Sequence, residues 1–244
     1  AGFEIDNALT FNDDDSAYLS RTPSVAGNRK TWTWSGWVKR GNLNTWDALF
    51  SAGADIFIGG SDSITFHNNA LYIYALGGSS GYAMVKTTQL FRDVSSWYHI
   101  VVAMDTTQVT ASNRVKIYVN GEQITDFVTS QYPNLNVEGH TNYSYTHYVG
   151  SGYSKTADSY LAEVNFVDGQ ALTPSDFGET DETYGHWKPK KYTGTYGTNG
   201  FYLDFKNSGS LGADVSGNSN NWTPNNLAAT DQMLDSPTNN FSTM

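Results

Sequence analysis

Residues 97–127, WYHIVVAMDTTQVTASNRVKIYVNGEQITDF, decide the fold because two apolar segments flank a polar connection. Side chains along a strand alternate between two faces, and in the first segment both faces are largely apolar. One face carries Tyr98, Ile100, Val102 and Met104, and the other carries Trp97, His99, Val101 and Ala103. The pattern predicts a central strand that is covered on both sides.

The second segment of this hairpin predicts a partner strand, because Val115, Ile117 and Val119 alternate with Lys116 and Tyr118. It ends in the Asn120-Gly121 pair, which is typical of a type I′ turn. Similar short segments, each ended by a turn signal, run along most of the chain.

Together these segments predict an all-β protein with almost no helix, either a sandwich or a barrel. A β-propeller would need a repeat of about 40 residues, which is not found. The residues that we expect in the core are Trp32, Trp34, Ile100, Val102, Ile117, Val119, Val164 and Phe166.

The composition excludes several classes of function. With 24 acidic and 14 basic residues, the net charge is -10, so a polyanion such as nucleic acid would be repelled. The chain has no cysteine, which excludes disulfides and thiolate metal sites. No apolar run approaches the roughly 18 residues of a membrane span, so we expect no membrane insertion. The 244 residues suit one large domain, or one domain with a tail.

Three motifs in order resemble the landmarks of laminin G-like domains in the concanavalin A-like lectin/glucanase superfamily. They are WTWSGWVKR at residues 32–40, the hairpin at 97–124, and YLAEVNFVDGQALTPSDF at 160–177. The resemblance covers about residues 8–178 and implies an antiparallel jelly-roll β-sandwich. It is informative about the fold and much less so about the function.

The C-terminal third has a different character. The segment 201–205, FYLDF, predicts a strand that closes the same sandwich, so we place one domain at 1–206 with a long loop at 179–200. Residues 207–244 have no Lys or Arg, and we expect an irregular Asn/Ser-rich tail or the start of a following module. A second, truncated repeat is the alternative. The whole layout resembles modules of bacteriophage virion and tail-fibre proteins, which implies an extracellular or virion-surface location.

Glu163, Asn165 and Asp168 raise the question of catalysis, because their spacing resembles the Glu-x-Asp-x-x-Glu signature of retaining β-glucanases. Such an enzyme needs two carboxyl groups about 5–5.5 Å apart. Here the middle acid is an amide, and Asp168 lies in an Asp-Gly turn. On this strand we expect Tyr160, Ala162, Val164 and Phe166 to face the core, with Leu161 and Glu163 on the other side. We therefore expect no catalytic residues and no enzyme activity.

Calcium is the cofactor that the sequence best supports, since Asp13, Asp14 and Asp15 crowd one turn and Ca²⁺ prefers oxygen ligands. A solvated acidic turn is the alternative and the preferred interpretation. The five histidines show no metal-binding spacing, and His99 is expected to be a hydrogen-bonded structural residue.

Tyrosines concentrate in residues 142–160, among small polar residues. Exposed aromatic rings offer flat apolar faces to sugars, so Tyr143, Tyr145 and Tyr153 are candidate ligand-binding residues, together with Trp46 in a predicted loop. The leading hypothesis is a carbohydrate-binding or adhesion module that recognises a cell-surface glycan. The alternative is a structural module that contacts neighbouring virion subunits, and a homo-oligomer fits both hypotheses. A glucanase-like glycoside hydrolase is the third hypothesis.

Overall fold

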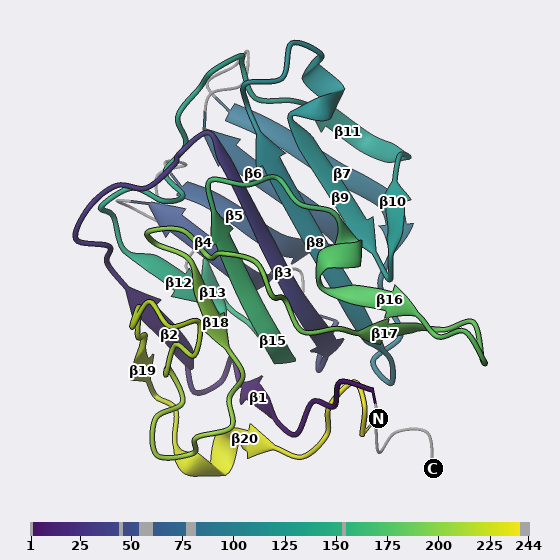
Figure 1. Cartoon of the computed structure of the whole chain (residues 1–244), viewed down its shortest axis with the longest axis vertical. Coiled ribbons are helices and arrows are strands. Elements are labelled where there is room, and N and C mark those ends of the chain that lie inside the picture. Colours follow the sequence, from purple (N-terminus) through teal and green to yellow (C-terminus); the bar gives the residue numbers. More distant parts are fainter. Residues whose placement is uncertain (1, 44–45, 54–60, 77–81, 153–154, 240–244) are drawn as a thin grey trace.

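Two large antiparallel sheets form the protein, as the computed structural model shows (Figure 1). It describes residues 2–43, 46–53, 61–76, 82–152 and 155–239. The first sheet has the order β10-β9-β8-β3-β15-β1-β20, and β18 pairs with β15 beside β1. Its strands are β1 (Ala8–Phe11), β3 (Thr31–Arg40), β8 (Trp97–Asp105), β9 (Val115–Val119), β10 (Glu122–Ile124), β15 (Ser159–Asp168), β18 (Phe201–Leu203) and β20 (Gln232–Met233).

The second sheet has the order β11-β7-β6-β5-β4-β12-β2-β19 and packs face to face on the first. Its strands are β2 (Tyr18–Arg21), β4 (Trp46–Gly53), β5 (Ser61–His67), β6 (Ala70–Leu76), β7 (Tyr82–Leu90), β11 (Phe127–Gln131), β12 (His147–Val149) and β19 (Thr223–Asn225). The predicted all-β, antiparallel jelly-roll sandwich is thus confirmed.

The remaining regular elements are small. Two hairpins lie outside the large sheets, β13 (Ser151–Gly152) with β14 (Lys155–Thr156) and β16 (Gly178–Thr180) with β17 (Trp187–Pro189). Three single-turn 3-10 helices are described, η1 (Ala111–Asn113), η2 (Pro174–Asp176) and η3 (Ala229–Asp231). In the described part of the chain, no helix has the length and apolar character that crossing a membrane requires.

The hairpin of β8 and β9 has the predicted geometry. Asn120 and Gly121 have φ values of 49° and 85°, as a type I′ turn requires. A side chain at Gly121 would also meet Trp187, whose ring lies 2.5 Å from the position of a Cβ atom. His99 is buried between two partners, Trp187 Nε1 at 2.9 Å and Ser35 at 2.9 Å, which confirms its structural role. Burial lowers the pKa of His99 to about 3.

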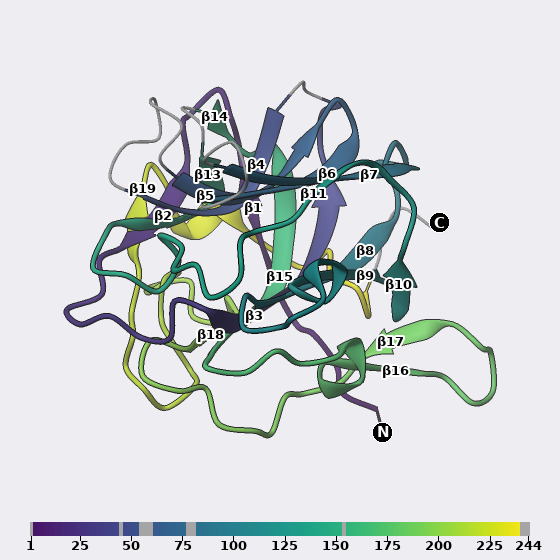
Figure 2. The same cartoon turned by 90° about the horizontal axis from the view of Figure 1, so that it is seen from above.

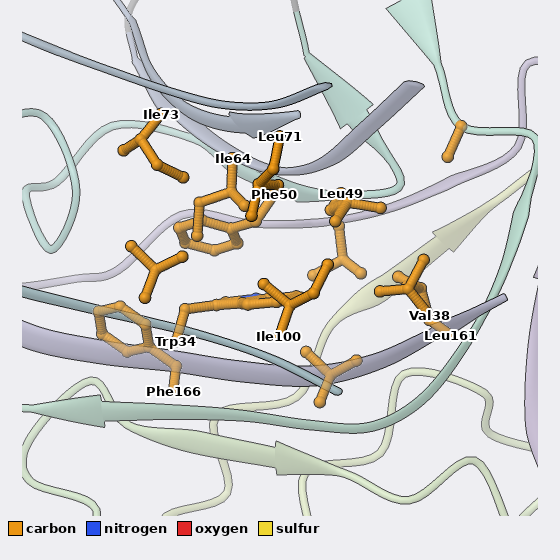
Figure 3. Close-up of a cluster of buried hydrophobic side chains, with 14 of the residues drawn as sticks. Trp34, Val38, Leu49, Phe50, Ile64, Leu71, Ile73, Ile100, Leu161 and Phe166 are labelled. Carbon is orange, nitrogen blue, oxygen red and sulfur yellow. The ribbon is translucent and has the colours of Figure 1, made fainter. Parts of the chain in front are cut away.

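All eight predicted core residues are buried in the cluster between the two sheets. Figure 3 shows how this cluster is built: Trp34, Ile100 and Phe166 rise from the first sheet toward Phe50 and Ile64 of the second. The strand β3 alternates in the same way, because Trp32, Trp34 and Val38 enter this cluster and Trp37 packs on the opposite face.

The predicted alternation of β15 is wrong in its first half. Leu161 enters the core between the sheets, whereas Tyr160 and Ala162 face the other way. The cause is a β-bulge, since the pairing with β3 shifts between Ala162 and Asn165 and Glu163 has a φ of 51°. An extra residue at a bulge reverses the alternation, so that the expected facing returns from Val164 onward.

A third layer covers the outer face of the first sheet (Figure 2). It is formed by the chain that follows β15, and its side chains pack on Val101, Tyr118 and Val167 of the sheet. The covering residues are Phe177, Tyr192 and Tyr196, and Tyr202 of β18 packs with them on the outer face of the sheet. The first sheet is therefore buried on both faces, as the doubly apolar pattern of β8 predicts.

The C-terminal segment is part of the same packed body. β18 pairs with Val164–Phe166 of β15, β19 extends the second sheet and β20 extends the first. Leu211 and Trp222 enter the core between the sheets. The domain boundary expected after residue 206 does not coincide with any break in this packing.

The position of Phe166 yields a test of the core. Replacing Phe166 with Ala should lower the free energy of unfolding by about 3–5 kcal/mol, because the residue is 2% exposed and its removal leaves a cavity. Urea unfolding followed by tryptophan fluorescence measures this loss. Val128→Ala is the control, since Val128 is 67% exposed and should change stability by less than about 0.5 kcal/mol. A loss below about 1 kcal/mol for Phe166→Ala would contradict the packing described above.

Candidate functional site

A row of ring side chains crosses the outer face of the second sheet, and we call it the aromatic row: Trp46, His67, Tyr72, Tyr74 and Tyr82. Trp46 of β4 lies opposite His67 of β5, and their rings stack with centroids 3.9 Å apart and 7° between planes. Tyr72 meets Trp46 edge-on at 6.1 Å. Tyr74 and Tyr82 extend the row to β7 at spacings of 6.1 and 5.1 Å.

Strand alternation places these rings on the outer face. In β6, Tyr72 and Tyr74 alternate with Leu71 and Ile73, which enter the core between the sheets. Tyr72 and Tyr74 are 9% and 7% exposed, while Trp46, His67 and Tyr82 are half-buried. The row therefore combines rigid, packed rings with accessible ring surface at both ends.

The pKa shifts of His67 and Tyr72 both favour the neutral form of the side chain. Burial, and after it the charge of Lys86, lowers the pKa of His67 below its ordinary value. Burial also raises the pKa of the Tyr72 hydroxyl, with a smaller contribution from Tyr74. The row therefore presents hydrogen-bond donors and acceptors on an apolar surface, without a negative charge of its own.

Serine hydroxyls lie beside the row and lack partners. Ser63 of β5 is placed between Tyr74 of β6 and Ser51 of β4, and it points outward because its neighbour Ile64 enters the core. The Oγ atoms of Ser61 and Ser63 are buried and have no hydrogen-bond partner in the described part of the chain. A buried hydroxyl without a partner costs about 1–3 kcal/mol, so these two groups suit a water molecule or a polar ligand.

The predicted binding residues do not form one site. Trp46 belongs to the aromatic row, but it is the first residue of β4 and not part of a loop, so that expectation is wrong. Tyr143 and Tyr145 lie elsewhere, in the connection before β12, with their rings in edge contact at 4.7 Å. The Arg29 guanidinium covers the Tyr143 ring at 4.2 Å, so one face of this ring is occupied. Tyr153 lies outside the described residues.

His67, Tyr72, Tyr74 and Tyr82 are not among the binding residues predicted from the sequence. A signal for two of them exists in LYIYAL, residues 71–76, where the tyrosines alternate with aliphatic residues and so must share the face opposite the core. The cross-strand neighbours of these tyrosines depend on the registers of β4 to β7, which the sequence does not specify on its own.

The glucanase-like position is closed by the third layer. The Tyr202 hydroxyl donates to Glu163 Oε2 at 2.5 Å, and the Tyr196 hydroxyl donates to Asn165 Oδ1 at 2.7 Å. Asp168 accepts hydrogen bonds from the backbone N–H groups of Asn28 and Asn199 and from the Asn142 amide. All three side chains thus hold loops and strands together on a buried surface.

Burial raises the pKa of Glu163 to about 7, against the opposing effect of the Tyr202 hydrogen bond. Glu163 Oε1 has no hydrogen-bond partner among the residues that the structure describes. A carboxyl group in this position is therefore held partly protonated by its apolar surroundings near neutral pH.

The acidic turn at Asp13–Asp15 is held by the Asn12 side chain. Asn12 Nδ2 donates to Asp15 Oδ2 at 2.9 Å, and the N–H of Asp14 donates to Asn12 Oδ1 at 3.1 Å. Within the described ranges, no three acidic or histidine side chains are grouped as a metal site requires. Asp15 also lines a cleft of about 450 Å³, together with Asp158 and Tyr160. Calcium binding at this turn stays a prediction.

Comparisons with known proteins agree with this architecture. A laminin G family model, described as "Concanavalin A-like lectin/glucanases superfamily", matches residues 11–177. No curated protein matches the chain.

Similar solved structures include three that illustrate the range of the fold. A heptameric SAP-like pentraxin from Limulus polyphemus has a TM-score of 0.50 at 14% identity, over 70% of this chain and 80% of the pentraxin. A candidate carbohydrate-binding protein from Bacteroides ovatus has a TM-score of 0.51 at 15% identity, over 91% and 59%. Domains LG4-5 of the mouse laminin α1 chain have a TM-score of 0.48 at 13% identity, over 79% and 47%. This chain thus spans about half to four fifths of these neighbours.

Glu163→Gln should change how stability depends on pH. The folded state keeps the Glu163 proton up to a pKa of about 7, whereas the unfolded state releases it near 4.5, so wild-type stability falls as pH rises between these values. The variant cannot ionise at this position and should gain on the order of 2 kcal/mol over wild type between pH 4.5 and 7.5. Urea unfolding of both proteins across this range gives the difference, in which the other titrating groups cancel. A constant difference across the range would contradict a buried, protonated Glu163.

A calcium titration tests the acidic turn. An ion bound only to the folded state at Asp13–Asp15 should raise the melting temperature at millimolar Ca²⁺, and Asp14→Asn with Asp15→Asn should remove this rise. Differential scanning fluorimetry in the presence of Ca²⁺ or of a chelator measures it. Equal melting temperatures in the two conditions would leave the solvated turn as the interpretation.

Proposed function

Because this chain belongs to the laminin G family of the concanavalin A-like lectin/glucanase superfamily, we propose that it is a non-enzymatic carbohydrate-binding module whose ligand lies along the aromatic row. Its setting is extracellular or on the surface of a virion or fibre, where it attaches the particle or protein to a cell-surface glycan.

The stacked pair of Trp46 and His67 on the outer face carries this proposal. A half-buried tryptophan held in place by a parallel ring offers a rigid apolar surface, to which the C–H groups of a sugar ring bind at little cost in side-chain entropy. The buried hydroxyls of Ser61 and Ser63, which have no partner among the described residues, lie farther along the same side of the sheet and suit an ordered water molecule. An apolar surface with a few polar groups is the usual construction of a small-ligand site.

The superfamily and the fold of the Bacteroides ovatus protein support a sugar ligand by analogy of architecture alone. The closed position of Glu163 supports binding without hydrolysis. A few stacking contacts leave little net affinity after ordering costs, so each copy should bind weakly. Several copies on one particle or oligomer would then supply firm attachment through effective concentration.

A structural module that contacts neighbouring subunits is the second candidate. Strand β11 is uncharged and lies at the edge of the second sheet, with Val128 67% exposed. Such an edge can pair with a strand of another subunit.

A glycan array probed with a multivalent display of the full chain separates the two candidates, and calorimetry on the bound glycan then locates the site. Trp46→Ala should weaken binding at least about tenfold, the usual effect of removing a central aromatic contact. Tyr148→Ala should have no effect, because Tyr148 pairs with Tyr18 on the same sheet outside the row.

Two further variants test the other candidate positions. If the double change Tyr143→Ala with Tyr145→Ala abolishes binding and Trp46→Ala does not, the site lies before β12. If only Tyr160→Ala abolishes it, the site is the cleft beside Asp15 and Asp158. If no glycan binds the multivalent display, the structural candidate replaces the proposal.

A further inference from the structure

Among the described residues, no strand of the second sheet directs a carboxylate to its outer face. The eight strands contain only two acidic residues, Asp47 and Asp62, although the whole chain has 24. Both point inward: Asp47 binds Arg40 of the first sheet, and Asp62 accepts a hydrogen bond from the Thr141 N–H at 2.7 Å on the same side of β5 as the core residue Ile64. In a protein with a net charge of -10, this face is thus depleted of negative charge.

Lys86 lies on this acid-free face, beside the aromatic row. It is directly opposite Tyr72 on β6 and Thr129 on β11, so it faces outward like Tyr72. Its charge reaches the row, because it contributes to the lowered pKa of His67. Throughout the part of the chain that the structure describes, Lys86 makes no ion pair, whereas Lys30, Lys39, Lys188 and Lys206 each do.

An ammonium group without a carboxylate neighbour, next to stacked rings, matches one kind of sugar. We propose that the aromatic row binds a glycan that carries a carboxylate, such as a uronic acid, with the Lys86 ammonium as the partner of that carboxylate. This inference rests on the proposed function and adds the class of sugar to it. The sugar ring would contact Trp46 and Tyr72 while its carboxylate pairs with Lys86.

The charge distribution favours a singly charged sugar unit over a densely sulfated chain. One ammonium matches one carboxylate, and a charge-assisted hydrogen bond of this kind is about twice as strong as a neutral one. A polyanion would extend beyond the acid-free face and meet the negative field of the rest of the protein. The Lys86 side chain is half-buried, so added salt should weaken its pairing with the carboxylate of the sugar.

Matched pairs of sugars isolate the carboxylate. Glucuronic acid is compared with glucuronamide, and galacturonic acid with its methyl ester, by NMR titration of the full chain. The acid should bind about fivefold more tightly than its neutral partner at low salt, and the preference should shrink at 0.5 M NaCl. Lys86→Gln should abolish the preference and leave the affinity for the neutral sugar unchanged.

Lys116→Gln is the matched control, since it removes the same charge from β9 in the other sheet. If it reduces the preference as much as Lys86→Gln, the effect comes from net charge and the inference is overturned. The inference also fails if the acid and neutral sugars of a pair bind equally. It fails as well if no sugar of either pair binds while another glycan still binds in a way that depends on Trp46. In both cases the proposed function stands. Absence of all glycan binding would instead overturn the proposed function.

Discussion

A buried ion pair between Arg40 and Asp47 connects the two sheets, and the register of the second sheet depends on it. Both side chains are fully buried, with Arg40 Nε 3.2 Å from Asp47 Oδ2. Ser159 of β15 donates to the same carboxylate at 2.7 Å. The guanidinium also donates to the Phe91 carbonyl and to Asn69 Oδ1, and it lies over the Phe66 ring at 4.5 Å. Two charges removed from water persist only when such additional hydrogen bonds satisfy them.

This pair also determines where Trp46 points. Asp47 must face inward to reach Arg40, and adjacent residues of a strand face opposite ways, so Trp46 must face outward. A slip of one residue in the register of β4 would turn Trp46 toward the core and Asp47 away from it. Arg40 would then be buried without its carboxylate partner. Burial raises the pKa of Asp47 to about 6, which is still below neutral pH. The carboxylate is therefore ionised at neutral pH and pairs with Arg40 there. The candidate site on the outer face is thus a consequence of charge compensation in the core.

The sequence predicts the parts of this structure that depend on alternation alone. The apolar patterns of β3, β8 and β9 predict their core faces, because these strands continue without interruption. The prediction fails where one residue breaks the period, at the bulge of Glu163, since nothing in the local sequence requires a glutamate with a positive φ. It also fails for the site. Arg29, which covers the Tyr143 ring, lies more than a hundred residues away in the sequence, and the position of the Trp46 ring depends on its stacking with His67. Both contacts arise from the tertiary structure.

The outer faces of the two sheets differ in how the chain covers them, and this difference bears on function. On the first sheet, Tyr192, Tyr196 and Tyr202 cover the surface around Glu163, so the residues whose spacing resembles the glucanase signature are part of a packed layer. Opening that layer would expose tyrosines and leave a carboxyl group without its hydrogen-bond donor, at a cost that a weakly bound sugar could not offset. The second sheet has a row of rings on its outer side, and its strands direct no carboxylate to that side among the described residues. Two buried serine hydroxyls there have no hydrogen-bond partner in the described part of the chain. Because the chain itself closes one face, the chemistry available for a ligand is concentrated on the other.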